Sequence, residues 1–580
     1  MRKNIALGLL IFSLCLPGTF YAQTQSKEEE VFFIAKKAFE DGYYEAGIGL
    51  LNRFLADFPR SSKAAEAELL LGQSYFYQNN LIESLNKFEA LLNKPYAANI
   101  KDAVSYWIAE AYFKSNNFPK AAEAYGRVIK EFPNSAYASL SVYSLGWSLF
   151  EEGKFQEALG YFRIMEDKYP KEPQALDASF KIVECLYNLK DYSSLKDKAR
   201  QLIKPFSKDA VRLAYLYFYI AESEFYSDNF TQALEFFKKA LKEGGDAKIQ
   251  VLSRLGTGWS YLRIKDYKKA ETEFAMLKEA SLDKARIEVL LLGKAEAFLR
   301  QGKLNEARVE FERAAKISDN KTTKEASLVQ AADIYFELGE YTEAINLYRA
   351  ISVSYPVGSY KDYVRKRTGQ VYYALGLGYF QNQDYDASIK IMERYRREMR
   401  EGYLSAEEAY LLGTSYYNAG NFSKAVEYFN EVISKSPDIL LLQKAEYGIA
   451  DSMYYLGNEK EALARFNALR CRYPGSKLTA KAIFWLAGYY YQHDELDLAS
   501  RYFLSLTQDF PKSELAAESY YSMGLISMAK GKNNEAAVFF KKAAEIGEPD
   551  FRSQALFSLA EVFESSGNLE MAVKEYLRVS

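Results

Sequence analysis

The sequence is poor in the residues from which most catalytic and metal sites are built. Its 580 residues include one histidine, His493, and three cysteines. A site with several histidine ligands is therefore excluded, and a histidine-dependent triad would have to use His493. The sequence also lacks a glycine-rich phosphate loop and the CxxC, HExxH and GxSxG motifs. We therefore expect no enzymatic activity, no cofactor and no metal site.

The sequence has almost no excess of charge of either sign. Its 75 lysines and arginines face 77 aspartates and glutamates, which gives a formal net charge of −2. Chains that bind nucleic acid or an anionic membrane surface along their length usually carry a positive excess. We therefore expect neither nucleic acid nor a membrane surface as a general partner.

The first 22 residues have the pattern of a signal peptide. Arg2 and Lys3 form a basic start, residues 5–17 are mostly apolar, and a plausible cleavage point lies near Ala22. The apolar run is too short to span a membrane as a helix. The pattern predicts an exported, periplasmic protein without a membrane span.

The three cysteines suggest no disulfide framework. Cys15 leaves a lipid anchor open as an alternative, although Leu14 precedes it where such signals have a small residue. Cys185 and Cys471 lie more than seven repeats apart, and a disulfide requires Cα atoms within about 7 Å. We expect both to be buried apolar thiols.

The rest of the chain repeats one pattern, clearest in residues 409–437. Two helix-compatible segments each carry a small residue, Gly413 in the first and Ala425 in the second. Glycine inside a helix costs about 1 kcal/mol relative to alanine, so its presence predicts a closely packed neighbour. Gly420 suits a tight turn, and Pro437 ends the second helix.

We define the anchor of a repeat as the small residue early in its second helix. Successive anchors are 36 to 38 residues apart, except for one gap of 44 between Ala344 and Ser388. The residue twelve before the anchor is Gly or Ala in all repeats but two, which have Ile34 and Val183. The anchors are Ala46, Ser84, Ala121, Ala158, Leu195, Ala233, Ala270, Ala307, Ala344, Ser388, Ala425, Ala462, Ala499, Ala536 and Ala572.

This unit resembles the tetratricopeptide repeat family over about residues 27–580. Leu412, Gly413 and Tyr416 match the L-G-x-x-Y half of the family motif, and Ala425 and Phe429 match its A-x-x-x-F half. The resemblance implies an all-α, right-handed superhelix of about fifteen helical hairpins. Repeats 1–9 occupy residues 27–356, and repeats 10–15 occupy residues 357–580 after a seven-residue insertion.

The segments between repeats resemble a narrower bacterial subgroup. Examples are the phrases of residues 131–135, 168–170 and 509–513, in which proline follows an aromatic residue. The proline stops the second helix, and a serine such as Ser135 or Ser513 can cap the next first helix. The subgroup includes Tol-Pal-associated and outer-membrane-assembly proteins, so the resemblance implies a scaffold for protein or peptide partners in the cell envelope.

Two recurrent positions are candidate binding surfaces. The position fifteen before the anchor is always apolar and often aromatic; this indicates either an aromatic groove or, as we favour, inter-repeat core. By resemblance, the position eleven before the anchor faces the concave groove, where acids and tryptophans suit a basic or amphipathic peptide. The alternative is a solvated helix face. The groove residues are Trp147, Trp259, Glu110, Glu184, Glu222, Glu296, Asp333 and Asp451.

Two basic clusters flank the insertion. They could bind an acidic partner, a phosphate-bearing glycan or lipid head groups, or they could belong to solvated helices with internal ion pairs. The clusters are Lys361, Arg365, Lys366 and Arg367, and Arg394, Arg396, Arg397 and Arg400.

The sequence thus predicts a non-enzymatic, exported scaffold. Partners could also contact the last repeat, which ends at Ser580 without a polar capping helix. The alternative function is polysaccharide binding or assistance in glycan export through an aromatic surface.

Overall fold

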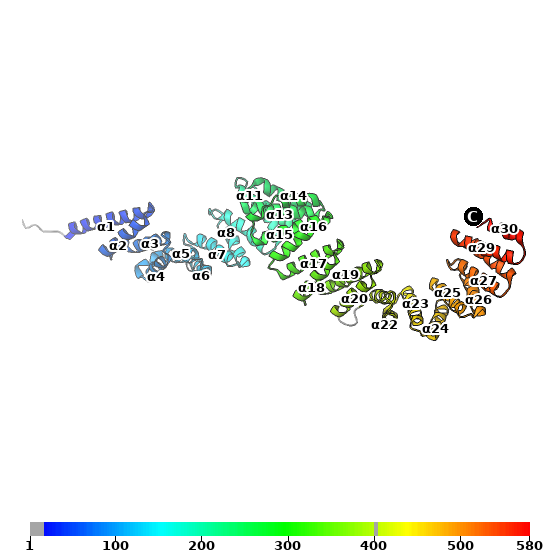
Figure 1. Cartoon of the computed structure of the whole chain (residues 1–580). Helices are drawn as coiled ribbons and strands as arrows, with labels where there is room; N and C mark the ends of the chain where they lie inside the picture. Colours follow the sequence, from blue (N-terminus) through cyan, green and yellow to red (C-terminus); the bar gives the residue numbers. More distant parts are fainter. Residues whose placement is uncertain (1–16, 400–403, 580) are drawn as a thin grey trace, which may run out of the picture. The chain divides into compact units, whose positions relative to one another are not determined.

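The computed structural model describes residues 17–399 and 404–579 of the chain. Thirty α-helices and two 3-10 helices follow one another in the described residues, and no strand occurs among them. Consecutive α-helices pack as antiparallel pairs (Figure 1), which confirms the predicted all-α class and the fifteen helical hairpins. Of the predicted signal peptide, residues 1–16 lie outside the described residues, and residues 17–22 begin α1.

The chain forms two compact units, Met1–Glu310 and Phe311–Ser580. The boundary lies within α16 (Leu304–Ile317), whereas the sequence predicts one after residue 356. The helices before it are α1 (Pro17–Glu40), α2 (Tyr44–Asp57), α3 (Ala64–Tyr77), α4 (Leu81–Leu92), η1 (Pro95–Ile100), α5 (Lys101–Lys114), α6 (Phe118–Glu131), α7 (Ala138–Glu151), α8 (Phe155–Lys168), α9 (Ala175–Asn188), α10 (Tyr192–Leu202), α11 (Ala210–Tyr226), α12 (Phe230–Glu243), α13 (Ala247–Arg263), α14 (Tyr267–Ala275), η2 (Glu279–Ser281) and α15 (Lys284–Arg300).

The second unit continues the same alternation of first and second helices. Its helices are α17 (Lys321–Glu337), α18 (Tyr341–Ser354), α19 (Lys361–Gln381), α20 (Tyr385–Met399), α21 (Ala406–Asn418), α22 (Phe422–Lys435), α23 (Ile439–Tyr455), α24 (Glu459–Arg472), α25 (Lys477–Gln492), α26 (Leu496–Asp509), α27 (Ala516–Ala529), α28 (Asn533–Ile546), α29 (Pro549–Ser565) and α30 (Leu569–Tyr576).

Each hairpin turn contains one residue with a left-handed backbone, five positions before the anchor. Eight of these residues are glycine, the type that adopts positive φ without strain. In the first repeat the turn residue is Gly42, so the equivalent anchor is Gly47, which is buried, and not Ala46, which is exposed. The predicted register is therefore wrong there by one residue. Twelve residues before Gly47 lies the fully buried Ala35, which replaces Ile34 as the small residue.

The small residues of the first helices make room for aromatic rings. A Cβ atom at Gly413 of α21 would lie 2.9 Å from the Phe429 ring of α22, and one at Gly448 of α23 would lie 2.6 Å from the same ring. Phe429 is thus held between the first helix of its own repeat and that of the next. Phe274 is held in the same way by Gly258 and Gly293.

The aromatic residues fifteen before the anchor also contribute to this core. Tyr410 packs on Phe429 with ring centroids 5.8 Å apart, and Tyr447 packs on Phe466 at 5.3 Å. Such tilted and edge-to-face pairs are favourable beyond the area they bury. This position is therefore mainly a packing position, as favoured from the sequence.

The prolines and serines between repeats act as expected. Second helices end one or two residues before Pro133, Pro170, Pro356, Pro437, Pro474 and Pro511. The Ser135 hydroxyl accepts a hydrogen bond from the backbone N–H of Tyr137 (3.0 Å), and the Ser513 hydroxyl accepts one from Leu515 (3.3 Å). These hydroxyls bind backbone groups immediately before α7 and α27.

The seven-residue insertion is helical. Helix α19 has 21 residues and begins 27 positions before its anchor Ser388, whereas α7 begins 20 positions before Ala158. The additional residues therefore extend the start of α19 by about two turns. Val364 and Thr368 in this region are 1 % and 5 % exposed, so the extension is packed against its neighbours.

The two cysteines of the described residues differ in environment. Cys185 is buried, and burial raises the pKa of its thiol to about 12, whereas Cys471 is exposed; both are free. Burial as predicted is therefore confirmed for Cys185 and wrong for Cys471. Among the described helices, none combines the length and apolar character required to cross a membrane.

Candidate functional site

A pocket of about 370 Å³ lies on the first-helix surface of the first unit. We call it the Trp259 pocket. Helices α11, α13 and α15 contact one another directly as well as their own second helices, so they form one surface. The predicted groove residues Glu222 and Trp259 line the pocket together. Its other lining residues are Tyr187, Phe218, Phe225, Tyr226, Leu252, Leu255, Gly256, Ala285, Arg286 and Val289, all on α9, α11, α13 and α15.

The repeat explains why Glu222 and Trp259 come together. Each lies eleven residues before its anchor, on the first helices α11 and α13. Equivalent positions in neighbouring repeats lie side by side along the array. The predicted groove position thus forms a real surface at this pair of repeats.

The pocket is mainly apolar, with accessible residues at its edge. Phe218 and Leu255 are 4 % and 5 % exposed and belong to the packed core. Tyr226 and Val289 are 59 % and 40 % exposed and remain open to a ligand. Apolar walls with few polar groups are typical of ligand pockets.

The indole of Trp259 packs edge-on against Phe274, with ring centroids 6.2 Å apart. Its Nε1 is buried and has no hydrogen-bond partner among the described residues. Leaving such a donor unsatisfied costs roughly 1–3 kcal/mol, a cost that phenylalanine or leucine would avoid. Stability alone therefore does not favour tryptophan at this position.

Glu222 is the titratable acid of the pocket. Burial raises the pKa of its carboxyl to about 7, opposed by a long hydrogen bond donated by the Tyr187 hydroxyl (3.4 Å). Near neutral pH the group therefore exists in both protonation states. A ligand cation beside it would favour the ionised state.

Trp147 occupies the equivalent position but is covered. The Lys181 ammonium lies 3.6 Å from the centroid of the Trp147 ring and forms an ion pair with Glu184 (2.5 Å). Lys181 itself is 9 % exposed. It follows Trp147 by 34 residues, and the residue that follows Trp259 by 34 is Gly293. The sequence carried this signal, and our sequence analysis did not use it.

Most of the other predicted groove acids accept hydrogen bonds within the protein. The Tyr125 hydroxyl donates to Glu110 (2.6 Å), the Tyr219 hydroxyl to Glu184 (3.5 Å) and the Tyr417 hydroxyl to Asp451 (2.5 Å), while Glu296 pairs with Arg300 (2.8 Å). These carboxylates tie helices or neighbouring residues together. Of the predicted acids, Glu222 is the one that lines the Trp259 pocket.

Asp333, the remaining predicted acid, binds a member of the first basic cluster. Its carboxylate accepts from the Arg367 Nε (2.7 Å) and from the hydroxyls of Tyr363 (2.7 Å) and Tyr348 (2.5 Å). The Arg367 guanidinium also lies over the Phe336 ring at 4.7 Å. Arg367 is therefore a packing residue of α19.

The other basic residues divide by environment. Arg394 pairs with Glu398 (3.0 Å), and Arg396 binds the Tyr428 hydroxyl. Lys366 and Arg397 are exposed. Lys361 and Arg365 line a pocket of the second unit. Arg400 lies outside the described residues.

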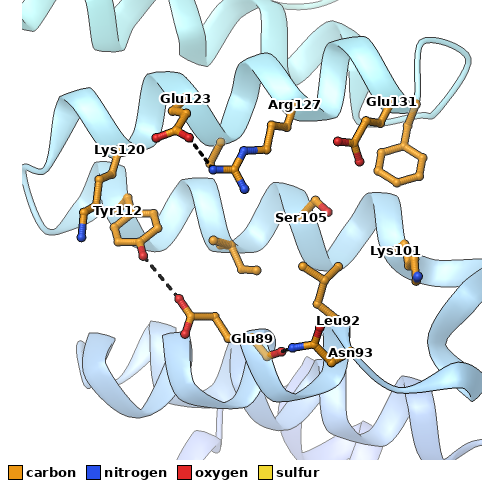
Figure 2. A pocket seen from close by; sticks show the side chains of 13 residues that line it. Glu89, Leu92, Asn93, Lys101, Ser105, Tyr112, Lys120, Glu123, Arg127 and Glu131 are labelled. Carbon is orange, nitrogen blue, oxygen red and sulfur yellow. Dashed lines mark hydrogen bonds and ion pairs between the residues drawn. The ribbon is translucent and has the colours of Figure 1, made fainter.

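A larger hollow, of about 580 Å³, lies between α4, α5 and α6. Figure 2 shows that its polar side chains largely bind one another: Arg127 pairs with Glu123 (2.5 Å), and the Tyr112 hydroxyl donates to Glu89 (3.3 Å). Its lining is mostly polar. This hollow offers less apolar surface to a ligand than the Trp259 pocket does.

The acids, cysteines and histidine form no cluster of three or more that could hold a metal ion within residues 17–399 and 404–579.

Comparison with known proteins identifies the repeat. One tetratricopeptide repeat model matches residues 106–173, 143–194 and 329–398, and three others match residues 406–439, 444–476 and 517–547. No curated protein matches the chain.

Several solved structures are similar in fold. The Cut9–Hcn1 hetero-tetramer of APC/C is 14 % identical, covering 87 % of this chain and 97 % of that one, with a TM-score of 0.28. The structure of Naa15/Naa10 bound to HypK-THB is 13 % identical, covering 96 % and 100 %, with a TM-score of 0.32. BtubC from P. vanneervenii is 19 % identical, covering 34 % and 87 %, with a TM-score of 0.27.

The hairpin repeat, its shared aromatic rings and the matches to four repeat models lead to one conclusion: the chain belongs to the tetratricopeptide repeat family.

Proposed function

We propose that this protein is a non-enzymatic, exported scaffold of the bacterial cell envelope that binds a peptide segment of a partner in the Trp259 pocket. Tetratricopeptide repeat proteins are protein-interaction scaffolds and are generally not catalytic, which supports the first part. Export to the periplasm rests on the signal-peptide pattern of residues 1–22. The envelope assignment rests on the phrases between repeats.

The observation that carries the peptide-binding role is the composition of the Trp259 pocket. It combines an apolar lining, a partly buried tryptophan without a partner for its N–H, and a carboxyl group poised near neutral pH. An apolar peptide side chain fits against Trp259 and Phe218, and a lysine or arginine beside it would pair with Glu222. Buried aromatic anchors with one charged contact are typical of interface hot spots.

Polysaccharide binding remains the second candidate because of Tyr226. Its exposed ring lies at the edge of the pocket and is stacked on Tyr192, with centroids 4.7 Å apart and planes 12° apart. A fixed, exposed aromatic ring is a suitable platform for a sugar. The test below separates the two candidates by the chemistry of the adduct.

Site-specific photocrosslinking in the native bacterium tests the proposal. A photoreactive amino acid at Val289, in the pocket, is compared with one at Val309, which is similarly exposed (43 %) but does not line it. We expect a peptide adduct from Val289 that disappears with Trp259→Ala, and none from Val309. Equal crosslinking at both positions, or an adduct that mass spectrometry identifies as carbohydrate, would contradict peptide binding.

A further inference from the structure

The extended start of α19 forms one wall of a separate pocket in the second unit. This α19 pocket, of about 410 Å³, lies between the end of α18, the start of α19 and the end of α20. Its apolar lining includes Val353, Tyr355, Pro356 and Val364. Unlike the Trp259 pocket, it is formed largely by second helices and by the inserted turns.

The insertion presents two different faces. Lys361, Val364 and Arg365 follow helical spacing and line the pocket. The opposite face is fixed in place, because Tyr363 and Arg367 both bind Asp333 of α17 (2.7 Å each). The pocket wall is therefore held by contacts that do not involve the pocket side chains.

The two carboxylates of the α19 pocket are already engaged. Glu325 accepts hydrogen bonds from the backbone N–H groups of Ser359 and Tyr360 (3.0 Å each). Glu398 accepts from the Arg349 Nε (3.2 Å), the Arg394 Nε (3.0 Å) and the Tyr372 hydroxyl (2.7 Å). These contacts use much of the capacity of both groups to bind a cation from outside.

The cationic side of the pocket is less satisfied. Lys361 is exposed, and within the described residues its ammonium forms no ion pair or hydrogen bond. Arg365 lies one turn further along the same wall. The uncompensated charge of the pocket is therefore positive, and an anionic ligand group complements it.

The edge of the pocket is unusually apolar for a solvated surface. Val353 is 82 % exposed, and Val357, next to Pro356, is 90 % exposed. Exposed apolar residues gathered around a cavity are typical of interaction sites. A small inorganic anion would leave this apolar surface uncovered.

We propose that the α19 pocket binds an acidic peptide segment, with an apolar side chain in the cavity and a neighbouring carboxylate paired with Lys361 and Arg365. The partner of this site is thus opposite in charge to the one proposed for the Trp259 pocket. The two sites lie in different units, so each can be tested without disturbing the other.

Fluorescence anisotropy of the full chain with two labelled peptides tests the proposal. One peptide alternates leucine and phenylalanine with glutamate, and the other has glutamine in place of every glutamate. We expect the glutamate peptide to bind at least tenfold more tightly. Equal affinities, or no binding of either peptide, would overturn the proposal.

A matched pair of variants locates the site. Lys361→Glu and Lys366→Glu make the same charge change on the same helix, but only Lys361 lines the cavity. Glutamate at position 361 also suits the first turn of α19, so Lys361→Glu should fold. We expect Lys361→Glu to weaken the glutamate peptide at least tenfold and Lys366→Glu less than twofold.

A third variant and two further probes complete the test. Val353→Asp should weaken the glutamate peptide as well, because it removes the apolar edge. If inorganic phosphate or vesicles with anionic lipid compete for the site and Val353→Asp has no effect, the site recognises anions alone and the peptide proposal is wrong. Equal losses in both lysine variants would indicate unspecific attraction and would also overturn it.

Discussion

The ammonium of Lys181 lies 3.6 Å above the ring of Trp147, and the position equivalent to Lys181 beside Trp259 is occupied by Gly293. Two tryptophans at the same position of the repeat therefore have different environments. A lysine side chain from the following repeat covers one of them, whereas a glycine has no side chain with which to cover the other.

This difference predicts opposite effects of two matched substitutions. Trp147→Ala removes a ring packed under Lys181 and should lower the free energy of unfolding by roughly 2 kcal/mol or more. Trp259→Ala should destabilise less, because it also removes an unsatisfied N–H, and should weaken binding at the Trp259 pocket at least tenfold. Denaturant unfolding and crosslinking at position 289 measure the two quantities. Loss of binding in Trp147→Ala alone would reverse our assignment.

The raised pKa of Glu222 predicts a pH dependence of stability. The native state retains a proton that the unfolded chain releases above its ordinary pKa of 4.5, so stability should fall as pH rises from 4.5 to about 7 and then stay level. Glu222→Gln should remove this slope and make the protein relatively more stable at pH 8 than at pH 5. Thermal midpoints of both proteins at the two pH values provide the measurement. Parallel pH profiles would show that Glu222 titrates normally.

The same group predicts a pH dependence of binding. The ionised fraction of Glu222 rises from about one-tenth at pH 6 to about nine-tenths at pH 8, so the affinity for a lysine-containing peptide should rise roughly tenfold. The same peptide with glutamine in place of lysine serves as the control and should bind equally at both pH values. Titration calorimetry measures both affinities. A stronger response of the glutamine peptide would exclude Glu222 as the cause.

The hairpin turns predict a stabilising substitution. Lys265 has φ of 66°, which strains a residue with a Cβ atom, whereas Gly339 occupies the same turn position at 77° with open space around it. Lys265→Gly should raise the free energy of unfolding by about 0.5–1 kcal/mol, and Gly339→Ala should lower it by a similar amount. Denaturant unfolding of both variants measures this, and a loss of stability in Lys265→Gly would show that its side chain contributes more than the strain costs.

The predicted export can be tested on the mature chain. The signal-peptide pattern predicts that the first 22 residues are removed. Mass spectrometry of the protein purified from the native cell envelope should show an N-terminus at or near Gln23. An intact Met1, or a diacylglyceryl group on Cys15, would contradict cleavage near Ala22.

The sequence was sufficient for the periodic features of the fold. The spacing of the anchors, the turn residues and the prolines each depend on local backbone requirements, and the helices begin and end accordingly. The first repeat was misplaced because Ala46 and Gly47 are both small, and only the position of Gly42 distinguishes them.

The candidate sites were harder to predict because they depend on contacts between repeats. The acids eleven before the anchor looked like a charged groove, but hydroxyls such as those of Tyr125 and Tyr417 occupy their oxygens. These tyrosines lie 15 residues after or 34 before the acids, beyond any local motif. Likewise, Arg367 looked equivalent to Lys361 in composition, and only the direction of each side chain from α19 separates a packing residue from a pocket residue.

The ring of Phe429, shared between Gly413 and Gly448, has a consequence for dividing the chain into fragments. The hairpin is the unit of the sequence, but the unit with a complete interior runs from one second helix to the first helix that follows it. A fragment cut after α22 would leave half of the Phe429 environment exposed to water, whereas one cut after α23 would keep it whole. Fragments intended for crystallisation or partner mapping should therefore end half a repeat later than the repeat boundaries suggest.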